Sequence, residues 1–168
     1  MAQETVAPQI DVNQPNAFMT EAIRLAIANV ESGDGGPFAA IVVRHGEIVS
    51  RGVNLVTSTT DPTAHAEVVA IRKACQALNT FELHDSEIYT TCEPCPMCMG
   101  AIYWARLARV YFANTRADAA QAGFDDSFIY DEIARPVDSR KIPMTGLMRE
   151  EALESFRVWE RTQDKIRY

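Results

Sequence analysis

A histidine, a glutamate and two cysteines are the residues of this chain whose types and spacing could carry out chemistry. The segment "HAE", from His65 to Glu67, precedes "PCPMC", from Pro94 to Cys98, along the chain. Cys95 and Cys98 are three positions apart, so their side chains face the same way on a helix. The first turn of a helix exposes backbone N–H groups and the positive end of the dipole, which favours metal-binding thiolates. The spacing therefore predicts a metal site.

The ligand types indicate which metal this site holds. Two thiolates and one imidazole select zinc, so we predict one Zn²⁺ per chain bound by His65, Cys95 and Cys98. Three protein ligands leave the fourth position for water, whose pKa zinc lowers from about 15.7 to roughly 7. Glu67 can take the proton of that water and deliver it to a ring nitrogen and to a departing amine. The combination His-x-Glu with Pro-Cys-x-x-Cys is the known signature of zinc deaminases.

The same histidine and cysteines are also compatible with a structural zinc site or a redox pair. Cys-x-x-Cys alone also marks redox sites and structural zinc sites. Cys92 could complete a four-ligand structural site, but it ends a predicted strand before Pro94, so we expect a buried apolar residue, as for Cys75. A redox pair would leave His65 and Glu67 without a task. A zinc-stapled interaction module without catalysis stays an alternative, and it predicts that Glu67→Ala changes neither function nor fold.

Alternating helix and strand patterns must position these residues. Apolar residues at helical spacing predict a first helix that Asn16 caps and that runs to about Ser32. The segment "PFAAIVVRHGEIVSRGVNLV" predicts a β-hairpin that turns at His45-Gly46. The segment "DPTAHAEVVAIRKACQAL" predicts a helix capped by Asp61, with Pro62 in its first position.

The second half of the chain continues this alternation. "SEIYTTC" and "ARVYFAN" are predicted strands on either side of the helix "EPCPMCMGAIYWA", which makes a parallel crossover unit. Residues 116–135 are predicted to form two short helices broken at Gly123, and residues 143–148 a last short strand before the final helix "EEALESFRVWERTQDKI". The predicted fold class is α/β, a three-layer α/β/α arrangement with a central mixed sheet of about five strands.

Size and charge limit the function further. The chain has 168 residues and a net charge of −7. We expect a loose N-terminal tail over residues 1–15 and a single domain over residues 16–168. The acidic charge argues against a broad nucleic-acid-binding surface, since that affinity comes from Lys and Arg on phosphates. No stretch has the length and apolarity to span a membrane and no targeting segment is apparent, so a cytoplasmic location is expected.

At its motifs the chain resembles the cytidine-deaminase-like superfamily, from about Asn16 to Tyr168. "DPTAHAEVVAIRKAC" and "CEPCPMCMGAIYWAR" fit this superfamily, its tRNA adenosine deaminases included. "ADAAQAGFDDSFIYDEI" and the terminal Tyr168 resemble the small bacterial guanine deaminases. This resemblance implies zinc-dependent deamination of guanine to xanthine and ammonia by a homodimer whose C-terminal segments are exchanged. A tRNA adenosine deaminase and a cytosine deaminase stay as alternatives with the same zinc chemistry.

The resemblance also implies roles for single residues. His65, Cys95 and Cys98 would bind zinc, Glu67 would move protons, and Asp126 would assist the departure of ammonia. The purine would contact Asn54, the backbone of Ala66, Phe38 and Tyr168, the last from its own or a neighbouring subunit. From the residues alone, Asn54 could simply form a turn and Phe38 could belong to the core. Asp125 or Asp126 could cap the next helix, and the sequence does not say which one faces the site.

Overall fold

The computed structural model describes residues 16–167, so the predicted tail 1–15 and Tyr168 lie outside the described residues. The chain divides at Asp125 into two units. The first, described over residues 16–125, contains every strand of the described chain and is termed the sheet unit. The second, described over residues 126–167, contains short helices and extended segments and is termed the C-terminal unit.

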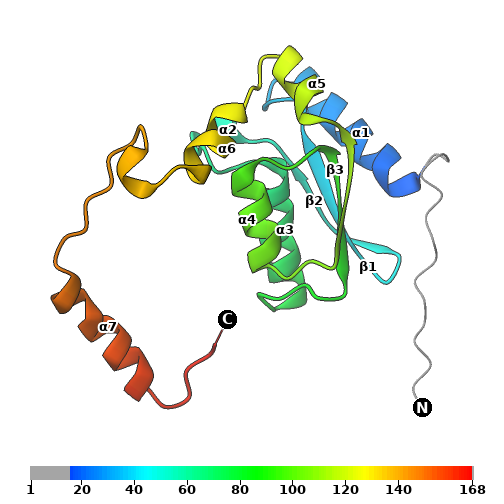
Figure 1. Ribbon diagram of the computed structural model, residues 1–168. Helices are drawn as coiled ribbons and strands as arrows, with labels where there is room; N and C mark the ends of the chain where they lie inside the picture. The colour runs from blue at the N-terminus through cyan, green and yellow to red at the C-terminus, as the bar shows by residue number, and fades with distance from the viewer. Residues whose placement is uncertain (1–15, 168) are drawn as a thin grey trace, which may run out of the picture. The chain divides into compact units, whose positions relative to one another are not determined.

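A mixed sheet of four strands forms the centre of the sheet unit (Figure 1). The strands are β1 (Ala39–Arg44), β2 (Glu47–Val53), β3 (Ser86–Cys92) and β4 (Arg109–Asn114). Their order is β2-β1-β3-β4; β1 runs antiparallel to both β2 and β3, whereas β3 and β4 are parallel. It follows that β2, β3 and β4 all point the same way, so their carboxyl ends lie at one edge of the sheet.

The predicted fifth strand over residues 143–148 is wrong, because these residues form no strand. Pro143 has no N–H to donate to a ladder, and the described part of the C-terminal unit offers no other strand to pair with. The hairpin prediction is confirmed: His45 and Gly46 connect β1 to β2 with φ values of 52° and 81°. Positive φ at both central residues is typical of the tight turn whose twist suits a two-residue hairpin.

Helices cover both faces of the sheet, so the three-layer prediction is confirmed for the sheet unit. Helix α1 (Ala17–Ser32) packs on β1 and β3, and Asn16 caps it by accepting hydrogen bonds from the N–H groups of Phe18 (2.9 Å) and Met19 (3.1 Å). Helices α3 (Ala66–Leu78) and α4 (Pro96–Trp104) lie side by side (Figure 1). An apolar core lies between these two helices and the sheet. Each face therefore has its own apolar cluster.

Helix α3 begins at Ala66, not directly after Asp61 as predicted. The Asp61 carboxylate instead accepts hydrogen bonds from the N–H (2.8 Å) and the hydroxyl (2.7 Å) of Thr63, which closes a local turn. Such a side-chain turn competes with the start of a helix. A short helix, α2 (Val56–Thr59), precedes this turn.

The approach of α3 to β2 depends on a glycine. A Cβ at Gly52 would lie 2.2 Å from the carbonyl oxygen of Ala66 and 2.5 Å from the backbone nitrogen of Ala70. Both distances are far inside van der Waals contact, so any larger residue would push the helix away from the strand. Gly52 therefore fixes how closely the start of α3 sits against the sheet.

The predicted break at Gly123 is confirmed. Helix α5 (Arg116–Gln121) ends before it, Gly123 takes a φ of 93°, and α6 (Ser127–Ala134) follows in the C-terminal unit. A 3₁₀ turn (Val137–Ser139) and α7 (Arg149–Arg161) complete the chain; the final helix is shorter than predicted, because Thr162 adopts extended backbone angles. Among all described helices, none combines the length and apolarity needed to cross a bilayer.

Candidate metal and substrate site

The predicted metal ligands come together at the sheet edge that carries the carboxyl ends of β2, β3 and β4. His65 is the N-cap residue of α3, Cys95 is the N-cap residue of α4, and Cys98 lies in the first turn of α4. His65 and Cys95 thus directly precede their helices, whereas the sequence pattern placed them in the first turns. Within residues 16–167, these three residues form the one group of His, Cys, Asp or Glu side chains with metal-ligand spacing.

The ligand distances fit zinc. The three donor atoms lie within 4.8 Å of one another, and His65 Nδ1 is 3.6 Å from Cys95 Sγ and 3.5 Å from Cys98 Sγ. Tetrahedral zinc bonds of about 2.1–2.3 Å place neighbouring ligand atoms roughly 3.5–3.8 Å apart. A zinc ion can therefore be bound without moving these side chains far.

The charges of the site also favour a divalent cation. Hydrogen bonding from the Cys98 thiol and proximity to His65 lower the pKa of Cys95 to about 4. The same contact with Cys95, burial and the nearby Glu67 raise the pKa of Cys98. Without a cation, the site tolerates one thiolate but resists the second. A bound Zn²⁺ would remove that conflict, because both thiolates would then face a double positive charge.

Glu67 is buried beside the ligands. It is the second residue of α3 and only 6% of its surface is exposed. Burial is the main cause that raises the pKa of its carboxyl group, and its side chain also interacts with Cys98. The structure therefore holds one buried carboxyl group beside the three metal-binding residues, where it can face a molecule bound at the metal.

Asn54 and Phe38 lie at the same sheet edge and are joined through the backbone. Asn54 follows β2, Phe38 precedes β1, and the N–H of Asn54 donates to the carbonyl of Phe38 at 3.0 Å. Asn54 Oδ1 accepts from the N–H of Val56 at 3.2 Å, so it does form a turn. The N–H of Leu55 donates to the carbonyl of Ala64 at 2.9 Å, directly before His65 in sequence. The backbone thus connects the candidate purine-binding segment to the candidate metal site.

The remaining predicted residues lie in three different parts of the chain. Ala66 begins α3 and is fully buried, and the N–H groups of a first helical turn have no acceptor within the helix. Asp126 occupies the N-cap position of α6 and belongs to the C-terminal unit, whereas Asp125 ends the sheet unit. Tyr168 lies outside the described residues.

The other cysteines behave as expected. Cys92 is buried and its thiol donates to the carbonyl of Thr115 at 3.6 Å, and it is not part of the metal-binding group. Cys75 packs against the core between the sheet and α3, where burial raises the pKa of its thiol. Both cysteines contribute to packing and leave the metal group with three protein ligands.

Phe124 and Asn29 also contribute to this region, and neither was singled out from the sequence. The rings of Phe38 and Phe124 meet edge to face, with centroids 4.9 Å apart and planes at 85°. Phe124 belongs to the "GFDD" stretch, so this contact ties that stretch to the start of β1. Asn29 of α1 is buried and donates hydrogen bonds to two backbone carbonyls of the same edge. Helical periodicity gave no signal for either contact, because both depend on tertiary neighbours.

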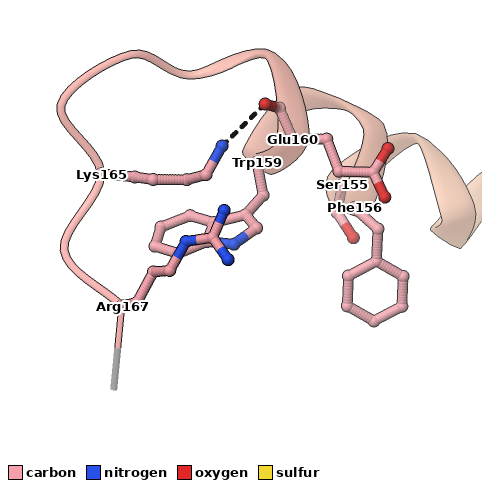
Figure 2. Close-up of a pocket in the computed structure, with 6 residues that line it drawn as sticks. All are labelled: Ser155, Phe156, Trp159, Glu160, Lys165 and Arg167. Carbon is pink, nitrogen blue, oxygen red and sulfur yellow. Dashed lines mark hydrogen bonds between the residues drawn. The ribbon is translucent and has the colours of Figure 1, made fainter.

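A surface hollow also occurs within the C-terminal unit. Figure 2 shows it at the end of α7, where it is lined by Ser155, Phe156, Trp159, Glu160, Lys165 and Arg167. The Lys165 ammonium donates to the carbonyl of Glu160 at 2.7 Å and lies 5.9 Å from the centre of the Trp159 ring. None of the predicted site residues lines this hollow.

Comparison with known proteins agrees with this geometry. The family described as the cytidine and deoxycytidylate deaminase zinc-binding region matches residues 12–114. The chain is 51% identical to guanine deaminase of Bacillus subtilis (strain 168), over 90% of this chain and 97% of that protein. It is 45% identical to a tRNA-specific adenosine deaminase of Aquifex aeolicus (strain VF5), over 57% of this chain and 63% of that protein.

Solved structures give the same picture. The crystal structure of guanine deaminase from Bacillus subtilis superposes with a TM-score of 0.89, at 50% identity, and covers 92% of this chain and 99% of that one. A structure of guanine deaminase from Nitrosomonas europaea superposes with a TM-score of 0.65 at 31% identity, covering 89% of this chain and 86% of that one. Together with the family match over residues 12–114, this places the chain among the zinc-dependent deaminases of the cytidine and deoxycytidylate deaminase family.

Proposed function

We propose that this chain hydrolyses guanine to xanthine and ammonia. The observation that carries the proposal is the extent of the similarity to Bacillus subtilis guanine deaminase, which covers 97% of that protein. The similarity to the Aquifex aeolicus tRNA-specific adenosine deaminase covers only 63% of that protein. Substrate choice in this fold depends on pocket shape, so similarity outside the zinc motifs is the relevant signal.

The proposed chemistry assigns one task to each charged residue of the site. His65, Cys95 and Cys98 hold zinc, which when bound supplies a hydroxide nucleophile from water at neutral pH. The buried Glu67 carboxylate takes one proton from the attacking water and passes it to the ring nitrogen beside C2. It then takes the second proton from the hydroxyl formed on C2 and delivers it to the departing amine. The bond from C2 to the exocyclic nitrogen breaks, a bond from C2 to oxygen forms, and one water is consumed for each ammonia released.

Neutral residues at the sheet edge would orient the base. The side-chain oxygen of Asn54 accepts from the N–H of Val56. Its amide nitrogen donates to no residue within the range 16–167 and is left for a ligand. In our proposal it donates to the purine, the backbone of Ala66 adds a second polar contact, and the Phe38 ring packs on the base. A buried polar group that is left unpaired disfavours bases lacking the matching atom.

Asp126 is proposed to assist ammonia departure as a second acidic group. It stands next to Asp125, and both follow the Phe124 ring that contacts Phe38. A carboxylate near the leaving amine would hold the protonated amine by a charge-assisted hydrogen bond as it departs. Comparing Asp126→Asn with Asp125→Asn would identify which of the two acts.

Turnover of four substrates tests the proposal. Zinc-loaded protein is incubated separately with guanine, cytosine, adenine and tRNA, and ammonia release is measured. We expect strong turnover with guanine and little with the others. Turnover of tRNA instead of guanine would favour the tRNA adenosine deaminase alternative, in which case binding should weaken steeply with salt. Turnover of cytosine alone would retain the zinc mechanism and contradict the proposed substrate.

We further propose that the active form is a homodimer that exchanges C-terminal segments, with Tyr168 completing the site of the neighbouring subunit. None of the described residues 126–167 is buried within the chain. Large apolar side chains are more than half exposed there, among them Phe128 (62%), Leu147 (82%) and Phe156 (65%). A segment of this size in which no apolar residue is fully buried is not stable by itself. A second copy of the chain offers matching surface through two-fold symmetry.

Complementation between two inactive variants tests the exchange. A chain lacking Tyr168 and a Glu67→Ala chain are each expected to release little ammonia from guanine. If Tyr168 acts in the neighbouring site, dimers refolded from an equal mixture regain about a quarter of the wild-type activity, because half are heterodimers with one complete site. If no activity returns although heterodimers form, Tyr168 does not act across the interface. Unchanged activity on deletion would show that Tyr168 is not needed.

A further inference from the structure

Asn29 connects α1 to the edge of the sheet where the proposed purine site lies. Its side chain is buried, with 5% of the residue exposed, and it projects from the last part of α1. Its amide nitrogen donates two hydrogen bonds of 2.9 Å each, to the carbonyl of Gly36 and to the carbonyl of Asn54. One amide group therefore bridges two chain segments, one on each side of the hairpin.

Both acceptors belong to the segments that carry the proposed purine contacts. The Gly36 carbonyl also accepts a hydrogen bond from the N–H of Phe38 at 2.8 Å, so Asn29 and Phe38 share this acceptor. Asn54 is held on its other side by the carbonyl of Phe38 at 3.0 Å. The side chain of Asn29 and the backbones of Phe38 and Asn54 thus form one connected hydrogen-bond network.

The glycine loop leaves this network no spare room. A Cβ at Gly35 would lie 2.0 Å from the carbonyl oxygen of Asn54 and 3.1 Å from the amide nitrogen of Asn29. The loop backbone, the Asn29 amide and the Asn54 carbonyl are therefore in close contact. A displacement of any one of them must move the others, because closely packed interiors do not absorb small shifts.

From this arrangement we infer that Asn29 is a positioning residue for purine recognition, which fixes the spacing between Asn54 and Phe38. The inference rests on the proposed function, and Asn29 itself does not need to touch the base. Without the two hydrogen bonds, the carbonyls of Gly36 and Asn54 lose their common donor and the two segments can separate. A misplacement of a binding group by a fraction of an ångström weakens recognition without affecting the metal ligands.

A double-mutant cycle distinguishes positioning from simple stabilisation. Asn29→Ala is expected to lower kcat/KM for guanine about tenfold, the equivalent of one to two lost hydrogen bonds. In an Asn54→Ala background the same substitution should change kcat/KM by less than about twofold, because the group it positions is already absent. Zinc content should equal that of the parent in all four proteins. An equal loss in both backgrounds, or no loss in either, would overturn the inference.

Controls separate this effect from damage to α1. Met19 of α1 packs with Ala22 and Tyr89 in the apolar cluster between α1 and the sheet. Met19→Ala should therefore lower the melting temperature without changing kcat/KM. Asn29→Ser, which keeps one donor, gives a milder variant if Asn29→Ala does not fold. A loss of kcat/KM in Met19→Ala as large as that in Asn29→Ala would count against positioning.

A binding measurement keeps this inference separate from the proposed reaction. In a Glu67→Ala background, calorimetry gives the Kd of 8-azaguanine with and without Asn29→Ala. Positioning is supported if Asn29→Ala raises the Kd roughly tenfold and has no such effect when Asn54→Ala is also present. This result would hold even if the parent protein does not turn over guanine. Absence of guanine turnover by the parent would contradict the proposed function alone. An unchanged Kd would contradict the role of Asn29 alone.

Discussion

Glu67→Gln is expected to lower kcat for ammonia release from guanine by about 10²–10⁴-fold, the usual contribution of a general acid–base group. The substitution keeps the size and shape of the side chain but removes the group that can carry a proton. The zinc content measured by mass spectrometry should equal that of the wild type, because the ligand set of His65, Cys95 and Cys98 is intact.

The stability of the same variant should not fall in parallel with its activity. Burial raises the pKa of the Glu67 carboxyl group, so ionising it in the folded protein is costly. A neutral amide does not carry this cost, and the melting temperature should stay the same or increase. Activity and stability would then change in different directions, which is typical of residues kept for function.

An exposed glutamate residue, Glu82, supplies the matched control. Glu82 lies in the loop before β3 and pairs with His84 at 3.2 Å on the surface. Glu82→Gln should leave kcat, zinc content and melting temperature close to those of the wild type, since exposed pairs contribute little. Full ammonia release by Glu67→Gln would contradict its proton-transfer role. Absence of ammonia release from the wild type with every substrate would instead favour a zinc-stapled interaction module.

Local signals predicted most elements of the sheet unit. The strand Ser86–Cys92 and the helix Ala17–Ser32 with its Asn16 cap agree with the patterns of apolar residues and the capping residue. The turn at His45-Gly46 also agrees, since few residue pairs accept positive φ at both positions. These features depend on neighbours within a few residues, so the sequence alone contains their cause.

A competing local turn explains one of the wrong predictions, and the lack of a strand partner explains another. Asp61 has the side chain of a helix cap, but its hydrogen bonds to Thr63 close a separate turn, and α3 begins at Ala66. Residues 143–148 have a strand-like pattern, but a strand also needs a partner, and the described C-terminal unit contains none. A pattern of residues cannot supply that partner.

The candidate site shows the same division. The metal-binding group was predictable because ligand type and spacing are both present in the sequence, and the sheet topology brings the two helix starts to one edge. The bridging role of Asn29 was not predictable, since its two acceptors lie 7 and 25 residues away and depend on the fold. The contact between Phe38 and Phe124 likewise joins two segments distant in sequence.

Cys98→Ala is expected to abolish stable zinc binding and, with it, ammonia release. Cys98 is fully buried, and its sulfur lies 3.5 Å from His65 Nδ1. Removal of one of three protein ligands leaves two, which is below the number typical of catalytic zinc sites. After dialysis, the variant should contain far less than one zinc per chain, whereas the wild type should retain it.

Thermal unfolding gives an independent measure of the same loss. A ligand that binds the folded protein stabilises it by RT ln(1 + [L]/Kd), so zinc should raise the melting temperature of the wild type. The same zinc concentration should have little effect on Cys98→Ala. A zinc-dependent shift of equal size in both proteins would show that Cys98 is not a ligand.

Cys92→Ala is the control that decides between a catalytic and a closed structural site. The Cys92 thiol contacts the carbonyl of Thr115, so its removal should cost some stability but no zinc. If Cys92→Ala also loses zinc, four protein ligands close the site and no position is left for water. If Cys92→Ala retains zinc and Cys98→Ala loses it, the metal has three protein ligands. The fourth position is then open for the water that hydrolysis requires.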